Sequence, residues 1–129
     1  LGHSEFKTRI HVDPNHLGWN EIGHNSPHTQ EIQIRVLDKV LEEKNIFKDI
    51  EFIKIDVEFF EPFVIAGLKD YFEKNKKDLP YILIEHNYEL SPYKKELTEV
   101  YTWLRNYYNP FEYDKIIGTK DILLKPINK

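Results

Sequence analysis

The amino-acid sequence predicts one α/β domain in which helices flank a mainly parallel sheet that carries an antiparallel edge pair. Two observations lead to this prediction. Short apolar segments typical of buried strands alternate with segments whose apolar residues recur at helical spacing. Polar side chains directly follow the two most apolar segments, where open α/β sheets place functional groups. The 129 residues suffice for a single domain with one core, and we expect a loop-rich lead-in at 1–30 and an α/β core at 31–129.

Composition excludes several classes of function. Hydrophobic residues make up 40% and aromatic residues 14% of the chain, which is enough for a packed interior and argues against disorder. The net charge is −4 and the basic residues are dispersed, so we expect no nucleic-acid partner. No apolar run approaches the roughly 20 residues that span a bilayer, so we expect no membrane partner. The absence of cysteine fits a reducing compartment, and we expect a cytoplasmic protein.

The first 30 residues are rich in His, Asn, Gly and Pro, and only residues 6–12 have the pattern of a short strand. The histidines of this segment are His3, His11, His16, His24 and His28. A metal-binding loop domain built on them is one alternative, since imidazole is a common metal ligand. Their spacing matches no zinc signature and no cysteine supports one. We therefore interpret them as solvated loop residues and predict no metal site.

Periodicity predicts the remaining elements in order. Residues 30–36 alternate apolar and polar side chains, which indicates a half-covered strand, and a short helix follows that ends near Asn45. Residues 52–57 and 81–84 are apolar runs typical of strands buried on both faces. A helix that contains Gly67 begins at Pro62, and another begins at Ser91. Residues 113–117 and 121–124 are predicted to form the closing antiparallel pair.

Polar residues cluster after both apolar strands. They are Asp56, Glu58 and Glu61 after the first strand, and Glu85, His86 and Asn87 after the second. Because neighbouring parallel strands end at one edge of a sheet, we expect Glu58 and His86 to face one cleft, where either can act as a general base on a substrate hydroxyl. Glu61, Glu85 and Asn87 are candidate substrate-binding residues. For Glu61, a role confined to stabilising the helix N-terminus stays open.

Three motifs occur in order along the chain. They are Val36-Leu37-Asp38, then Phe52-Ile53-Lys54-Ile55-Asp56-Val57-Glu58, then Ile82-Leu83-Ile84-Glu85. Together they resemble the carboxyl half of the FkbM family of S-adenosylmethionine-dependent methyltransferases, over about residues 30–125. The resemblance implies a partial Rossmann-like methyltransferase fold with S-adenosylmethionine as cofactor. It also implies O-methylation of a hydroxyl on a small-molecule acceptor, of the sugar or natural-product type.

Carried onto this sequence, the resemblance assigns Asp56 and Glu58 to acceptor orientation or proton removal, and matches Glu85 to the acid of the next strand. Two departures matter. The family pattern has glycine where Phe59 stands, and a large side chain there narrows the cleft or changes the turn into the helix. The family's first strand and glycine-bearing loop, which hold the cofactor, have no counterpart, so the resemblance names no cofactor-binding residue here.

Two classes of function are therefore compared. The first is a methyltransferase whose amino-terminal half lies outside this chain. The alternative is a non-catalytic α/β module for binding or assembly that pairs with another chain. An exposed sheet edge favours such pairing, as a homo-oligomer or with the missing amino-terminal segment.

Overall fold

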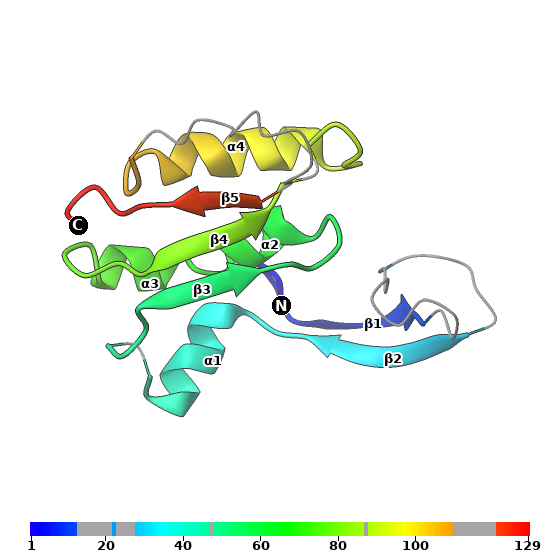
Figure 1. Cartoon of the computed structure of the whole chain (residues 1–129). Coiled ribbons are helices and arrows are strands. Elements are labelled where there is room, and N and C mark those ends of the chain that lie inside the picture. The colour runs from blue at the N-terminus through cyan, green and yellow to red at the C-terminus, as the bar shows by residue number, and fades with distance from the viewer. Residues whose placement is uncertain (13–21, 23–27, 47, 87, 110–120) are drawn as a thin grey trace.

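The computed structural model describes residues 1–12, 22, 28–46, 48–86, 88–109 and 121–129, which form a mixed α/β fold (Figure 1). In chain order its elements are β1 (Phe6–His11), β2 (Thr29–Ile34), α1 (Leu37–Lys44), β3 (Phe52–Ile55), α2 (Glu61–Ala66), α3 (Lys69–Lys74), β4 (Tyr81–Glu85), α4 (Lys94–Leu104) and β5 (Asp121–Leu124). In this part of the chain, no helix is long and apolar enough to cross a membrane. The strand predicted at 113–117 lies outside the described residues.

The strands in the described part of the chain form two small sheets, and only one of their three strand pairs is parallel, so the prediction of a mainly parallel sheet is wrong. β1 and β2 form an antiparallel pair of their own, in which Phe6 lies opposite Ile34. The other sheet has the order β3-β4-β5, with β3 and β4 parallel and β5 antiparallel to β4. The helical crossover from β3 to β4 gives the expected parallel pair, and β5 is the expected reversed edge strand. β2 departs from the prediction because a period-two pattern specifies a half-covered strand without specifying its partner.

The three-stranded sheet has one buried and one open face. The buried face consists of Ile53 and Ile55 of β3, Ile82 and Ile84 of β4, and Ile122 and Leu124 of β5. Ile65 of α2, Phe72 of α3 and Leu104 of α4 belong to the same core and are fully buried. On the opposite face, Phe52 and Leu123 are 53% and 54% exposed. The helices described between β3 and β5 thus cover one side of this sheet.

The single helix predicted after Pro62 is divided in two at Gly67. α2 ends there and α3 begins at Lys69. A Cβ atom added to Gly67 would lie 2.4 Å from the carbonyl oxygen of Gly2, closer than a real Cβ approaches a backbone atom. Glycine is therefore required at this position because the amino-terminal segment lies across the junction between the two helices.

Asp38 ties α1 to α3. Its two carboxylate oxygens accept the backbone N–H groups of Asp70 and Tyr71, each at 2.9 Å. The backbone N–H of Asp38 donates to the carbonyl oxygen of Gly67, also at 2.9 Å. A carboxylate at a helix N-terminus satisfies N–H groups that have no partner inside the helix. Asp38, part of the first sequence motif, therefore acts as the cap of a helix that begins 31 positions further along the chain.

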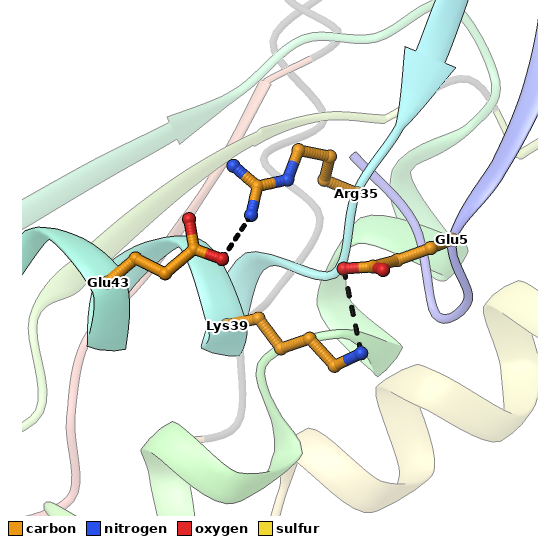
Figure 2. Close-up of polar contacts among 4 residues, drawn as sticks. All are labelled: Glu5, Arg35, Lys39 and Glu43. Carbon is orange, nitrogen blue, oxygen red and sulfur yellow. Dashed lines mark hydrogen bonds and ion pairs between the residues drawn. The ribbon is translucent and has the colours of Figure 1, made fainter.

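Polar contacts at the surface hold the amino-terminal segment beside the connection from β2 to α1. Figure 2 shows Arg35 paired with Glu43 and Lys39 directed toward Glu5. The Lys39 Nζ atom lies 3.6 Å from Glu5 Oε1. The backbone N–H of Gly2 also donates to the Arg35 carbonyl oxygen at 2.9 Å. Exposed ion pairs contribute little, so the backbone hydrogen bond of Gly2 and the pairing of β1 with β2 are the main restraints on residues 1–11.

Candidate active site

The carboxyl ends of β3 and β4 place three carboxylates side by side. Asp56 and Glu58 follow β3, and Glu85 is the last residue of β4. One carboxylate oxygen from each of the three residues lies within 4.8 Å of those of the other two. The structure thus brings these acids together as the sequence predicts, because β3 and β4 are parallel neighbours that end at the same edge.

Lys54 lies beside this group of acids. Its ammonium nitrogen is 2.8 Å from Oδ2 of Asp56, because side chains two residues apart project from the same face of a strand. The hydrogen bond from Lys54 lowers the pKa of Asp56 below its ordinary value, although burial opposes this effect. The same contact raises the pKa of Lys54. Asp56 is therefore ionised at neutral pH and can accept a hydrogen bond from a substrate.

The chain turns sharply after β3, at Glu58 and Phe59. These two residues have positive φ angles of 48° and 71°. The turn is closed by the N–H of Phe60, which donates to the Val57 carbonyl oxygen at 3.2 Å. Two successive positive φ values are typical of a type I′ turn, which favours glycine at its second central position. Phe59 occupies that position, so the turn gives a physical reason for the glycine of the family pattern.

Glu61 stabilises the same turn from within. It is only 3% exposed, and its Oε1 atom accepts the N–H of Val57 at 3.2 Å. The backbone N–H groups of Glu61 and Phe59 also interact with this carboxylate. Burial raises the pKa of Glu61, and these hydrogen bonds reduce the shift. The carboxylate lies inside the protein and binds backbone N–H groups, and Glu61 is not among the described residues that line a cavity beside Asp56 and Glu58. Its role as a substrate ligand stays a prediction.

A cavity of about 380 Å³ lies beside Asp56 and Glu58. Its remaining lining is apolar and includes Ile32 and Ile34 of β2 and Phe60 of the turn. The volume is in the range of small-molecule sites, which combine a mostly apolar wall with a few polar groups. The two carboxylates are therefore placed where they can contact a bound small molecule.

His86 is directed toward α4. Its Nδ1 atom lies 3.0 Å from the hydroxyl oxygen of Tyr101, and its ring stacks on Tyr88 with the centroids 6.1 Å apart. Burial lowers the pKa of His86, so its imidazole is neutral at pH 7. His86 does not line the cavity beside Asp56, and its catalytic role stays a prediction. Asn87 lies outside the described residues.

The three clustered carboxylates favour ligands that carry hydrogen-bond donors or positive charge. Ionised carboxylates at this separation repel one another, and a donor or a cation between them relieves that repulsion. Carboxylate oxygens are also the ligands that Mg²⁺ and Ca²⁺ prefer. If a divalent cation binds to the described part of the chain, Asp56, Glu58 and Glu85 have the geometry to hold it.

Two features of the site were missed from the sequence. Lys54 belongs to the second motif, and its spacing of two residues from Asp56 on a strand was the available signal. Ile32 and Ile34 form the apolar wall of the cavity, but the alternating sequence pattern predicts them only as the covered face of a strand. The place of this wall beside the acids depends on how the β1–β2 pair is positioned, and periodicity carries no information about that position.

An α/β domain with acids gathered at the carboxyl ends of parallel strands has the arrangement of an α/β enzyme domain. Comparison with protein families matches residues 2–110 of the 129 to the methyltransferase FkbM domain. The chain belongs to the FkbM methyltransferase family. Neither the curated proteins nor the solved structures include a match to this chain.

Proposed function

We propose that the protein is an S-adenosylmethionine-dependent O-methyltransferase that acts on a hydroxyl of a sugar or natural-product-type acceptor. The observation that carries this proposal is the grouping of Asp56, Glu58 and Glu85 within 4.8 Å at one sheet edge, in a chain of a methyltransferase family. The cavity beside two of these acids supports binding of the acceptor there.

In the proposed reaction, S-adenosylmethionine supplies a methyl group bonded to a positively charged sulfur. Glu58 accepts the hydrogen bond of the reacting hydroxyl, and Asp56 accepts one from a neighbouring hydroxyl of the acceptor. Together they align the reacting oxygen with that methyl group, which lowers the entropic part of the barrier. The hydroxyl proton becomes strongly acidic only as the new carbon–oxygen bond forms, so a carboxylate is a sufficient base. Lys54 keeps Asp56 ionised, so we assign orientation to Asp56 and proton removal to Glu58.

Methyl transfer from radiolabelled S-adenosylmethionine to a panel of hydroxylated acceptors tests the proposal. Asp56→Asn and Glu58→Gln should each lower kcat by about 10²–10⁴-fold, the usual contribution of a positioned acid or base. Glu51→Gln is the matched control, because Glu51 is exposed at the opposite end of β3 and should leave the rate unchanged. Full activity in both site variants would contradict the assignment of the acids.

Calorimetric titration with S-adenosylmethionine addresses the cofactor separately. Binding by this chain, or by a chain extended at its amino terminus, is the expected result. No binding by either would contradict the enzyme proposal and favour the non-catalytic module.

The open sheet face around Phe52 and Leu123 supports a further proposal, that this domain packs against another polypeptide surface.

A further inference from the structure

The hairpin formed by β1 and β2 has two chemically different faces. Strand pairing places Ile10, Ile32 and Ile34 on one face and residues such as Arg9 and Gln33 on the other. Figure 1 shows the hairpin extending away from the rest of the molecule. The apolar face points toward the residues that follow β3, since all three isoleucines line the cavity beside Asp56.

This apolar face is only partly covered by protein. Ile34, nearest to the body of the molecule, is 2% exposed, whereas Ile10 and Ile32 are half-buried. A two-stranded ribbon is at best marginally stable in water unless its apolar face packs against something. A ligand that fills the cavity would cover Ile10 and Ile32, and its apolar part would contribute binding energy there.

The polar end of the cavity discriminates by charge. Asp56 and Glu58 line it, and Glu85 stands within 4.8 Å of both. Lys54 pairs with Asp56 at 2.8 Å and offsets one of the three negative charges, so these four side chains together keep a formal negative charge. An anionic head group would be repelled by the acids, whereas a neutral head group with hydroxyls can donate hydrogen bonds to them.

We infer that the acceptor is a neutral amphiphile, with its hydroxyl-bearing end at Asp56 and Glu58 and an apolar portion against Ile10 and Ile32. This inference rests on the proposed function, whose acceptor it narrows. A bare sugar lacks the apolar portion, and an acceptor bearing a phosphate, sulfate or carboxylate has the wrong charge at the polar end.

Binding to the intact chain is measured by calorimetry and by NMR shifts of the isoleucine methyl groups, with monomeric octyl β-D-glucopyranoside as the probe. Glucose carries the head group alone, and octanoate carries the same chain length with a negative charge. Octyl glucoside should bind at least about tenfold more tightly than glucose, given the stabilisation of each buried CH₂ group. It should also bind about tenfold more tightly than octanoate, a difference that Glu58→Gln should reduce.

Two substitutions on one strand locate the binding face. Ile32→Glu should weaken octyl glucoside binding by about tenfold or more, because it places a charge on the apolar wall. Gln33→Glu adds the same charge to the opposite, exposed face and should leave binding unchanged. If circular dichroism shows that Ile32→Glu is unfolded, the milder Ile32→Thr substitution replaces it, with a smaller loss of the same sign. Equal binding of glucose and octyl glucoside, or no effect at Ile32 in a folded variant, would overturn the inference.

These binding measurements require no methyl transfer, so the two proposals can fail separately. Amphiphile binding at the isoleucine wall, with no methylation of any hydroxylated acceptor, would contradict the proposed function and leave the ligand class standing. Methylation of a bare sugar or an anionic acceptor at full rate in Ile32→Glu would support the function and overturn the ligand class.

Discussion

Phe59 adopts a backbone conformation that glycine adopts with less strain. A residue with a Cβ atom loses roughly 1–2 kcal/mol in the left-handed region, and Phe59 has a φ angle of 71°. The preceding Glu58 also has a positive φ, of 48°. Three N–H groups in and around this turn interact with the buried Glu61 carboxylate, which offsets part of the strain. The direction of the Glu58 side chain therefore depends on a turn that Glu61 holds in place.

Comparing Phe59→Gly with Phe59→Ala measures this strain. Both substitutions remove the aromatic ring, so their difference reports the backbone alone. The glycine variant should be more stable than the alanine variant by about 1 kcal/mol in urea unfolding. The order should reverse inside helix α1, where Glu42→Gly should be less stable than Glu42→Ala by about 1 kcal/mol. An alanine variant at position 59 as stable as the glycine variant would show that the turn is not strained.

Titration of Glu61 should change stability with pH. Burial raises its pKa above the ordinary value of 4.5, so the folded protein binds the proton more tightly than the unfolded chain does. This contribution to stability is complete below pH 4.5 and is lost as the pH rises through the raised pKa. The unfolding free energy of Glu61→Gln, measured relative to wild type from pH 4 to 7, should therefore increase as the pH rises.

Glu43→Gln is the matched control for this experiment, with the opposite sign. The hydrogen bond from Arg35 lowers the pKa of Glu43, so its contribution is present above the ordinary pKa and is lost as the pH falls. Relative to wild type, Glu43→Gln should thus lose stability as the pH rises, and by a small amount because Glu43 is exposed. A flat difference curve for Glu61→Gln would show that its carboxylate is not buried in solution.

At the scale of elements, α3 depends on a side chain from α1. Asp38→Ala removes the acceptor of two backbone N–H groups and should cost about 1 kcal/mol of unfolding free energy, as loss of a helix cap does. Asp38→Asn keeps one acceptor oxygen and should cost less. The control is Glu42→Ala, an exposed position on the same helix, which should change stability little. Equal stability of Asp38→Ala and Glu42→Ala would mean that the cap contributes nothing.

The elements differ in how far the sequence could predict them. β3, β4 and the apolar stripe of α4 were predictable because their patterns are local. The prediction that β3 and β4 are buried on both faces is wrong, because the helices cover only one face of the sheet and Phe52 is 53% exposed on the other. The break at Gly67 was not predictable, since it depends on Gly2, a residue distant in sequence. The cap formed by Asp38 likewise joins residues more than 30 positions apart.

The candidate site was predictable to a similar extent. Asp56 and Glu85 were placed together because adjacent parallel strands end at one edge. The sequence could not predict the inward direction of Glu61 or the contact of His86 with Tyr101. An acid in a first helical turn or a histidine after a strand can point several ways. Such directions depend on rotamers and on neighbouring elements.

At the scale of the whole molecule, the open face of the three-stranded sheet exposes large apolar side chains to solvent. Phe52 and Leu123 expose more than half of their surface there, beside the half-buried Leu83. Exposed apolar patches of this kind mark contacts with other proteins. This is the physical basis for proposing a polypeptide partner on this side.

Leu123→Lys tests that proposal. Sedimentation velocity of the wild-type chain should show association that strengthens with concentration, and the substitution should weaken it by about tenfold or more, since it removes a buried leucine from the contact. Thr102→Lys adds the same charge to the exposed surface of α4 and should leave association unchanged. A wild-type chain that stays monomeric at all concentrations would rule out a second copy as the partner.

The two ends of the chain are not equivalent for experimental work. Leu1 lines the cavity, whereas Lys129 pairs with Asp78, near the start of β4 and away from that edge (Figure 1). Residues that precede Leu1 in a longer chain, natural or added, would therefore emerge beside the cavity that Asp56 and Glu58 line. Affinity tags, fluorophores and surface-attachment groups should be joined after Lys129, where they stay away from that cavity during titrations.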